Sequence, residues 1–274
     1  MINLLYAGNS GVYDGILTSA LSAIMRQRGD EGVTVYLLTM SLTRVKDSYV
    51  AIGEGERERL EAALKAKNPH ARVELFDVSD LYEEHLGHNA NEDCYCSPYT
   101  LLRLLADLIP GIPDKLLYLD CDVMFAREPE LIWNTDVEDY EYAAARDHYG
   151  KLLLYPNYIN AGVLLFNMKK CRESGIFERA RELIRKKKLL FADQSALIRS
   201  TTRRKLLSQR YNDQKFLYKK TVIRHFSKRL FYLPYPHVEN VKQWQIKRVR
   251  EVFGYTAFDD IYAEYERIKN DEKR

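Results

Sequence analysis

The sequence predicts an α/β fold with a mostly parallel sheet flanked by helices. Three observations support this prediction. Short apolar runs alternate with helical patterns along the first half of the chain, an acid pair follows one such run at mid-chain, and the composition is that of a globular protein. The 274 residues are 46% apolar and 30% charged, which excludes a disordered chain. A chain of this length builds one large domain or two small ones.

The first half of the chain contains strands separated by helical patterns. Residues 2–7 form an apolar run that ends at Gly8-Asn9-Ser10-Gly11, which is typical of a strand followed by a turn. Apolar residues then recur at helical spacing over 16–24. The next predicted elements are a strand at 33–40, a charged helix at 54–67 and a strand at 72–78. This alternation favours parallel strands joined by right-handed crossovers.

The second half of the chain is less regular. A helix at 98–108, stopped by Pro110-Gly111, leads into an apolar run at 117–125. We expect strands at 142–145, 152–155 and 161–166, helices at 173–187 and 193–199, and closing helices at 238–253 and 258–269. After Tyr211 the pattern loosens into an aromatic, proline-containing region. The second half is therefore less regular than a doubly wound sheet, as if it were added to a first half that binds a nucleotide.

Asp120 and Asp122 are the most informative residues of the chain. In Leu117-Tyr118-Leu119-Asp120-Cys121-Asp122-Val123-Met124-Phe125 an apolar run stops at two carboxylates and then resumes. Carboxylates are almost never fully buried unless something pairs them. At the carboxyl end of a strand in an α/β sheet, the usual occupants are a ligand and its metal, and two carboxylates suit Mg²⁺ or Mn²⁺ bridging a diphosphate. The alternative is a strand end with two solvated acids.

The N-terminus and the cysteines predict a cytoplasmic protein. Met1-Ile2-Asn3-Leu4-Leu5 lacks the charged region and the cleavage site of a signal peptide. No apolar stretch reaches the length of a membrane span. With no export signal, the four cysteines are most simply free thiols.

Positive charge is concentrated in one region. The net charge is only +3, yet residues 199–250 hold 15 lysines and arginines against Asp213 and Glu239. Such a region faces nucleic acid, anionic lipid or a phosphorylated substrate, or is an ordinary solvated surface.

The closing helices carry both apolar and basic residues. Trp244, Val249, Val252 and Phe253 can line one side, while Lys242, Lys247, Arg248 and Arg250 populate the other faces. This combination is typical of a helix that lies peripherally on an anionic inner-membrane surface. The alternative is a helix packed on the core through the same apolar residues.

A set of ordered motifs resembles family 8 glycosyltransferases. The motifs are Tyr13, Arg103, the Asp-x-Asp run at 117–122, Asn160-Ala161-Gly162-Val163-Leu164-Leu165, Asp193-Gln194 and His225-Phe226. The resemblance covers about 2–231 and implies the GT-A fold, a Rossmann-like mostly parallel sheet flanked by helices. It also implies a retaining, metal-dependent enzyme that uses nucleotide sugars. The expected organisation is a GT-A transferase domain over 1–235 and a C-terminal helical extension over 236–274.

The resemblance implies a role for each matching residue. Asp120, Asp122 and His225 match the ligands of Mn²⁺ or Mg²⁺. Arg103 matches an arginine near the diphosphate and the sugar, where a guanidinium can contact phosphate through two nitrogens. The remaining positions are Ala7 and Asn9 at the nucleotide, Tyr13 stacked on the base, Asp147 and Asn160 at the sugar, and Asp193 and Gln194 beneath the anomeric centre.

The sequence departs from the family in its late motif. The usual His-x-x-Gly-x-x-Lys is here His225-Phe226-Ser227-Lys228-Arg229-Leu230-Phe231, so lysine replaces the glycine and phenylalanine the lysine. Lys228 or Arg229 would supply the charge that steadies the leaving diphosphate from a shifted position. Ser195 also replaces the second acid of the common Asp-Gln-Asp.

The preferred hypothesis is a hexosyltransferase that uses UDP-glucose or UDP-galactose. The expected acceptor is a glycan, a glycolipid or a glycoprotein, and no nucleic-acid partner is expected. The alternative is a catalytically weak sugar-nucleotide-binding remnant, or an adaptor at the membrane surface, which the altered late motif favours.

Other classes fit the residues less well. A sugar nucleotidyltransferase needs a basic Gly-rich loop after the first strand, but Gly8-Asn9-Ser10-Gly11 has no Lys or Arg. A haloacid-type phosphatase carries its acid pair on the first strand, followed by Thr, whereas Val123 follows the pair here at mid-chain. His85, His88, Cys94 and Cys96 match no closed four-ligand zinc pattern, and favour an acceptor-side loop or lid.

Overall fold

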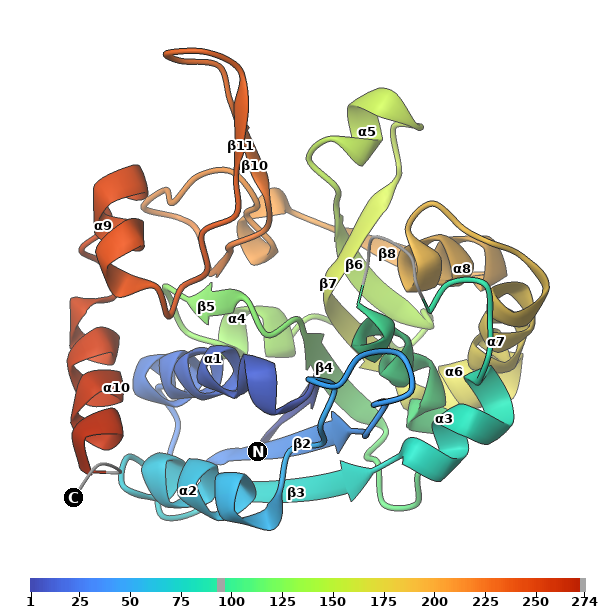
Figure 1. Cartoon of the computed structure of the whole chain (residues 1–274), viewed down its shortest axis with the longest axis horizontal. Helices are drawn as coiled ribbons and strands as arrows, with labels where there is room; N and C mark the ends of the chain where they lie inside the picture. Colours follow the sequence, from blue (N-terminus) through green and yellow to red (C-terminus); the bar gives the residue numbers. More distant parts are fainter. Residues whose placement is uncertain (93–96, 272–274) are drawn as a thin grey trace.

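The computed structural model of the chain describes residues 1–92 and 97–271, and over these residues seven strands form one central sheet (Figure 1). The strand order is β3-β2-β1-β4-β7-β6-β8. The strands are β1 (Ile2–Ala7), β2 (Val33–Thr39), β3 (Arg72–Asp77), β4 (Lys115–Leu119), β6 (Tyr142–Arg146), β7 (Ile159–Asn167) and β8 (Arg204–Leu207). Neighbouring strands pair in parallel except at β7, which runs antiparallel to β4 and β6. The predicted α/β fold with a mostly parallel sheet is confirmed.

Helices cover both faces of the sheet. Successive side chains of β1 alternate between two cores, with Leu4 and Tyr6 in one and Leu5 and Ala7 in the other. The first core also contains side chains from α1 (Tyr13–Arg26), α2 (Glu54–Lys65), α9 (Ile246–Phe253) and α10 (Asp259–Asp271). The second contains side chains from α3 (Ser79–Leu86), η2 (Pro98–Leu108), α6 (Met168–Ser174), α7 (Ile176–Lys186) and α8 (Ala192–Ser200). Burial on both faces explains why the central strands are continuous apolar runs.

The order of the strands reverses at β1. The chain proceeds from β1 through β2 to β3 at one edge, and then returns to the opposite side of β1 as β4. Ligands of open α/β sheets bind outside the carboxyl ends of the strands at such a reversal. Gly8 and Asn9 follow β1 here, and Asp120 to Asp122 follow β4.

A short antiparallel pair lies beyond β4. Strand β5 (Val123–Phe125) pairs with β9 (Ile223–His225), and Val123 is opposite His225. The Phe226 amide donates to the Asp122 carbonyl at 2.8 Å, which extends the pairing by one step. This pairing brings a residue from late in the chain beside the acid pair.

Two projections rise from the same side of the molecule (Figure 1). One is the loop that carries α5 (Gly150–Leu153), and the other is the hairpin of β10 (Arg229–Phe231) and β11 (His237–Glu239). The remaining short elements are η1 (Ser10–Val12), α4 (Glu130–Trp133) and η3 (Gln209–Tyr211).

Three predicted elements differ from the structure. The strand expected at 152–155 is instead α5 and its following loop, because the amides of Tyr149 and Gly150 donate to Asp147 Oδ1 and start a helical turn. The helix expected at 173–187 is α7, which begins only at Ile176 because Gly175, with a φ of +65°, separates it from α6. The apolar run at 117–125 is split into β4 and β5 by the turn that holds the acid pair.

The expected helix at 238–253 begins only at Ile246, and its apolar face is covered. Val249 is fully buried, while Trp244, Val252 and Phe253 pack against the first core. The prediction of an interfacial helix with these side chains in lipid is therefore wrong, and the alternative of a packed helix is confirmed. None of the helices within the described residues is both long and apolar enough to cross a membrane.

Helix α10 packs against α1. Ile261, Tyr262 and Tyr265 join the core that α1 covers, and Arg26 pairs with Asp260 at 2.6 Å. Residues beyond 235 thus share the core of the main sheet, and the division of the chain at 235 stays a prediction.

Candidate active site

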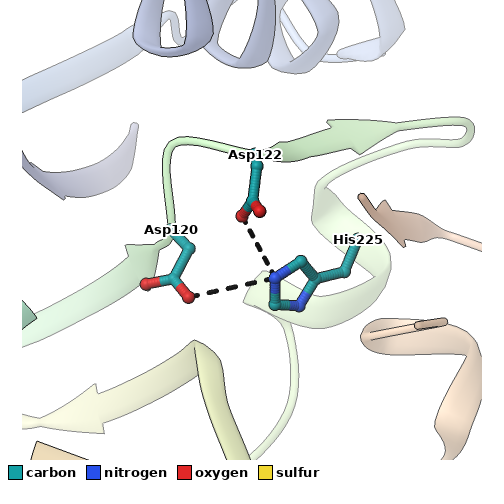
Figure 2. Close-up of side chains that lie close together, drawn as sticks. All are labelled: Asp120, Asp122 and His225. Carbon is teal, nitrogen blue, oxygen red and sulfur yellow. Dashed lines mark ion pairs between the residues drawn. The ribbon is translucent and has the colours of Figure 1, made fainter. Parts of the chain in front are cut away.

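Asp120, Asp122 and His225 converge at the carboxyl end of β4 (Figure 2). His225 Nε2 lies 3.1 Å from Asp122 Oδ1 and 3.9 Å from Asp120 Oδ2. One ligand atom of each residue lies within 4.8 Å of those of the other two. Two carboxylate oxygens and an imidazole nitrogen at this spacing fit one divalent ion such as Mn²⁺. The sequence therefore predicted a set of residues that the fold brings together from positions about 100 residues apart.

Gly162 makes room for this cluster. A Cβ atom at this position would lie 2.7 Å from Asp120 Oδ2 and would also overlap the His225 ring. The Asp120 amide donates to the Gly162 carbonyl at 2.8 Å, so β7 passes directly behind the acid pair. The glycine of the Asn-Ala-Gly motif is thus required by close approach.

A chain of hydrogen bonds fixes the imidazole of His225. Asp147 Oδ2 accepts from Asn160 Nδ2 at 2.9 Å, and Asn160 Oδ1 accepts from Asn212 Nδ2 at 2.8 Å. Asn212 Oδ1 lies 3.0 Å from His225 Nδ1. Because a carboxylate only accepts, each amide in the chain has one orientation, and Nδ1 of a neutral His225 must carry the proton. Nε2 faces the two aspartates, where a charged ring donates to Asp122 and a neutral ring offers its lone pair to a metal ion.

Lys242 contacts the Asp122 carboxylate. Its Nζ donates to Asp122 Oδ2 at 2.5 Å. Burial raises the pKa of Asp122, but Lys242 and His225 outweigh burial, and the pKa lies well below its usual range. Burial likewise lowers the pKa of Lys242, and Asp122 reverses that shift, so the pKa of Lys242 is raised. The pair is therefore ionised.

Arg103 contacts Asp120. The guanidinium, whose side chain is 1% exposed, donates to Asp120 Oδ1 at 3.0 Å and stacks on the Tyr118 ring at 3.8 Å. Asp193 lies 3.3 Å from the same guanidinium. Burial lowers the pKa of Arg103, while Asp193, Tyr118 and Asp120 raise it on balance. A buried arginine thus holds two carboxylates from different elements.

Asp193 and Gln194 begin helix α8 beside this group. Asp193 is buried, and burial raises its pKa although Arg103 opposes the shift. Gln194 Oε1 accepts from the Ala161 amide at 2.9 Å, which ties α8 to the Asn-Ala-Gly strand. The two residues predicted beneath the anomeric centre are therefore connected to the acid pair through Arg103 and Ala161.

A pocket of about 470 Å³ opens next to the acid pair, between the ends of β1 and β4. Ala7 and Asn9 line it, as predicted, together with Asp120 and Asp122. It is also lined by residues that the sequence did not indicate: Ser48, Tyr49, Ser97, Tyr99, Thr100, Lys242 and Trp244. A larger hollow of about 700 Å³ includes Arg28, Trp133 and Arg210 but none of the predicted site residues. Size alone would therefore select a cavity that lacks the predicted residues.

Tyr13 and Lys228 are not brought into the pocket lining. Tyr13 is buried, and its hydroxyl donates to the Glu56 carbonyl at 3.0 Å. Lys228 is an exposed residue just before β10. Of the suggested zinc ligands, Cys94 and Cys96 lie outside the described residues, while the ring of His88 is exposed and 3.8 Å from Glu83.

Asn212 and Lys242 are the site residues that sequence reasoning missed. Asn212 stands in a region without a regular pattern, and Lys242 was grouped with the basic residues of the last helices. The only local signal is that Lys242 precedes Trp244, which also lines the pocket.

Comparison with known sequences identifies a protein family. The model of glycosyl transferase family 8 matches residues 5–244. The glycosyltransferase GlyA of Streptococcus pneumoniae serotype 4 is 35% identical over 105 residues, which are 37% of this chain and 14% of GlyA. The chain therefore spans a small part of that relative.

Solved structures share the fold over nearly the whole chain. An active-site mutant of LgtC superposes with a TM-score of 0.68 at 18% identity and covers 98% of this chain and 96% of LgtC. The galactosyltransferase LgtC in complex with donor and acceptor sugar analogues gives 0.67 at 19% identity, over 97% and 95% of the two chains. GlyE of Streptococcus pneumoniae TIGR4 gives 0.66 at 18% identity, over 99% of this chain and 63% of GlyE.

Because these identities are below 20%, the likeness to solved structures establishes only the fold. The match to the family model establishes the family to which the chain belongs. The matched residues 5–244 contain the acid pair, the Asn-Ala-Gly strand, His225 and Lys242, which the fold gathers at one end of the sheet. The chain therefore belongs to glycosyltransferase family 8.

Proposed function

We propose that the protein is a retaining hexosyltransferase that uses UDP-glucose or UDP-galactose as donor and Mn²⁺ or Mg²⁺ as its metal. The acceptor is a glycan, a glycolipid or a glycoprotein. The observation that carries the proposal is the cluster of Asp120, Asp122 and His225, whose two acids line a pocket between two strand ends. The complex of LgtC with donor and acceptor sugar analogues supports a nucleotide-sugar donor for this fold.

The metal would be held by Asp120, Asp122 and His225. A divalent ion bound there supplies positive charge to a departing diphosphate. The protein's own contribution is to keep His225 in the tautomer with Nε2 unprotonated, through Asn212 and Asn160. Lys242, whose amine already lies at the acid pair, is placed to donate to the diphosphate. It would thus serve in place of Lys228 or Arg229.

The nucleoside would occupy the pocket beside Asn9. Tyr49 and Trp244 are half-buried aromatic residues in its lining, and they offer ring faces on which a base can stack. We assign this stacking role to them rather than to Tyr13, because the Tyr13 hydroxyl is bonded to Glu56 and its side chain is buried.

The sugar would lie toward Asn160, Asp193 and Gln194. Asp193 is buried against Arg103 and Gln194 is an amide bonded to Ala161, so neither is arranged as an exposed nucleophile. We therefore favour attack on the same face of the sugar, in which the acceptor hydroxyl gives its proton to the leaving phosphate. Asp147 would act mainly by orienting Asn160, because its Oδ1 accepts from two backbone amides.

We place the enzyme in the cytoplasm. Cys121 and Cys171, the cysteines that the structure describes, are both unbridged. Burial raises the pKa of both thiols, which makes them poor nucleophiles. The second candidate function is a catalytically weak binding remnant, which Phe231 at the position of the family lysine favours.

Thermal unfolding with a panel of nucleotide sugars tests the proposal. UDP-glucose or UDP-galactose should raise Tm in the presence of Mn²⁺ and much less with chelator, because ligand binding to the folded state stabilises it. The matched nucleotides GDP-mannose and CMP are the controls. Release of UDP on incubation with the stabilising sugar would separate an enzyme from a remnant. Equal shifts with chelator, or none with any UDP-sugar, would reject the donor and metal assignments.

A further inference from the structure

The two projections that Figure 1 shows are the α5 loop and the β10–β11 hairpin, and both carry exposed large apolar side chains. On the α5 loop, Leu152 and Leu153 are 74% and 78% exposed. On the turn between β10 and β11, Leu233 is 83% exposed, with Tyr232 and Tyr235 exposed on either side of it. Leucines exposed to this extent on two neighbouring projections are unusual in a water-facing surface.

The projections share a base with a third, basic segment. The Leu230 amide donates to the Tyr149 hydroxyl at 3.2 Å, which joins β10 to the α5 loop. The His148 amide donates to Gln214 Oε1 at 2.7 Å, which joins the α5 loop to the segment at 214–220. We call residues 148–157, 214–220 and 228–240 together the projecting surface.

Charge on the projecting surface is almost entirely positive. Its basic residues are Lys151, Lys215, Lys219, Lys220, Lys228 and Arg229, and its one acid is Glu239. Arg229 stacks on Phe216 at 4.9 Å, so the basic segment is continuous with the base of the hairpin. Exposed leucines, tyrosines beside Leu233 and several lysines on one surface match the combination of acyl chains, interface and phosphates in a lipid monolayer.

We propose that the projecting surface docks the enzyme on an anionic membrane, with Leu152, Leu153 and Leu233 entering the acyl region. The apolar residues are on separate tips, whereas a stable protein dimer buries about 800 Å² per partner over a continuous patch. Basic residues near an anionic surface add long-range attraction that salt screens. The charge complementarity and the shape thus favour lipid over a second copy of this chain.

Docking in this orientation has a consequence for the active site. The α5 loop connects Asp147 to Asn160, and the hairpin lies between His225 and Lys242, so each projection is anchored at both ends in the polar network of the site. Docking would set the sugar side of the site close to lipid headgroups, where a lipid-linked acceptor presents its glycan. This consequence rests on the proposed function, but the binding to membranes does not.

Co-sedimentation with vesicles tests the proposal directly. We expect the protein to bind vesicles of phosphatidylcholine mixed with phosphatidylglycerol at roughly 0.05 M salt, and to be released at roughly 0.5 M. Vesicles of phosphatidylcholine alone should bind much less. Absence of binding to the anionic vesicles at low salt would overturn the proposal, whatever the transferase activity proves to be.

Two sets of variants measure separately what the exposed leucines and the lysines contribute to vesicle binding. The triple variant Leu152→Ser, Leu153→Ser and Leu233→Ser should bind about tenfold more weakly, because the apolar contribution is lost. Its matched control is Val50→Ser with Leu190→Ser, which changes exposed apolar residues outside the surface. Equal binding by the triple variant and this control would overturn the role of the tips.

The second set changes charge. Lys219→Glu with Lys220→Glu should lower the affinity for anionic vesicles, while Lys187→Glu with Lys188→Glu, at exposed positions elsewhere, should lower it much less. Equal loss in the two pairs would mean attraction by net charge alone and would overturn the assigned surface.

Insertion depth distinguishes lipid from other partners. In a Leu153→Trp variant, the added fluorescence should be quenched by brominated acyl chains in anionic vesicles. No quenching, or a dimer in light scattering that the triple variant converts to monomer, would reject lipid in favour of a headgroup-only or self-association contact.

Discussion

The Asp120 end and the Asp122 end of the active site are charged in different ways. Arg103, at the Asp120 end, is fully buried, stacks on Tyr118 and also pairs with Asp193. Lys242, at the Asp122 end, is about a quarter exposed and lines the pocket together with the acid. An arginine holds its partners through a rigid planar fork, whereas a lysine is a point charge on a flexible stem. One end is thus part of the folded core, and the other can rearrange when a ligand enters.

The largest expected effect is that of Arg103→Met. Removing the guanidinium leaves Asp193 buried without its cation, and loss of one partner of a buried pair costs about 3–5 kcal/mol. Urea unfolding should show this loss in the free energy of unfolding. Arg172→Met is the control, since its partly exposed pair with Asp114 should contribute about 1 kcal/mol or less. Similar losses in the two variants would contradict a core role for Arg103.

Asp120→Asn and Asp122→Asn should have similar effects on metal-dependent binding and different effects on stability. Both variants should weaken Mn²⁺-dependent UDP binding by more than the roughly 10–100-fold that loss of an outer partner costs. Only Asp120→Asn removes a charge next to the buried Arg103, so it should also lower the free energy of unfolding more than Asp122→Asn does. Calorimetry and urea unfolding give the two quantities.

Asp139→Asn, at an exposed carboxylate outside the site, is the reference for these two variants. It should leave both quantities unchanged. Unchanged metal-dependent UDP affinity in Asp122→Asn would remove Asp122 from the metal site.

Asn212→Ala should weaken metal binding without touching a ligand. Its amide fixes the His225 tautomer, and loss of such a partner costs about 10–100-fold in metal affinity. Nitrogen NMR of the His225 imidazole should show the proton on Nδ1 in the wild type and a mixture of tautomers in the variant. Asn157→Ala, an exposed asparagine bonded to Arg146, should change neither. A wild-type imidazole with its proton on Nε2 would be incompatible with the proposed chain.

The smallest effect is expected for Lys242, the more flexible of the two cations that contact the acid pair. Lys242→Met should strengthen Mn²⁺ binding in the absence of nucleotide by about fivefold, because an opposing charge worth roughly 1 kcal/mol is removed. The same change should weaken UDP binding in the presence of metal. Lys228→Met, outside the pocket, should alter both affinities by less than about twofold. Calorimetric titrations in which the two lysines behave alike would reject the special role of Lys242.

Local pattern predicted every strand of the central sheet except β8, and it indicated most of the residues that gather around the acid pair. The strands of the first half are buried on both faces, so their apolar runs are unambiguous, and the acid pair interrupts one of them. The predicted Asn160, Asp193, Gln194 and His225 all belong to the network around that pair. Each of them lies in a motif short enough to be recognised along the chain.

Local pattern failed where long-range contacts decide the outcome. Lys242 meets Asp122 across 120 positions, and Asn212 reaches His225 only because η3 turns the chain back on itself. The apolar run at 152–155 resembles a core strand, but the capping of α5 by Asp147 turns it outward. Periodicity reports which residues are apolar and does not report whether anything covers them.

The pairing of Val123 with His225 has a consequence for how the enzyme assembles. It closes a loop of about 100 residues, and the entropy of that closure must be offset before the third metal ligand is in place. A chain shortened before residue 220 would keep the strands of the central sheet and both aspartates, yet it would lack β9 and the imidazole. The proposed metal and donor would bind only after closure, so they should slow hydrogen exchange most in the amides of β5 and β9, far more than in the central strands.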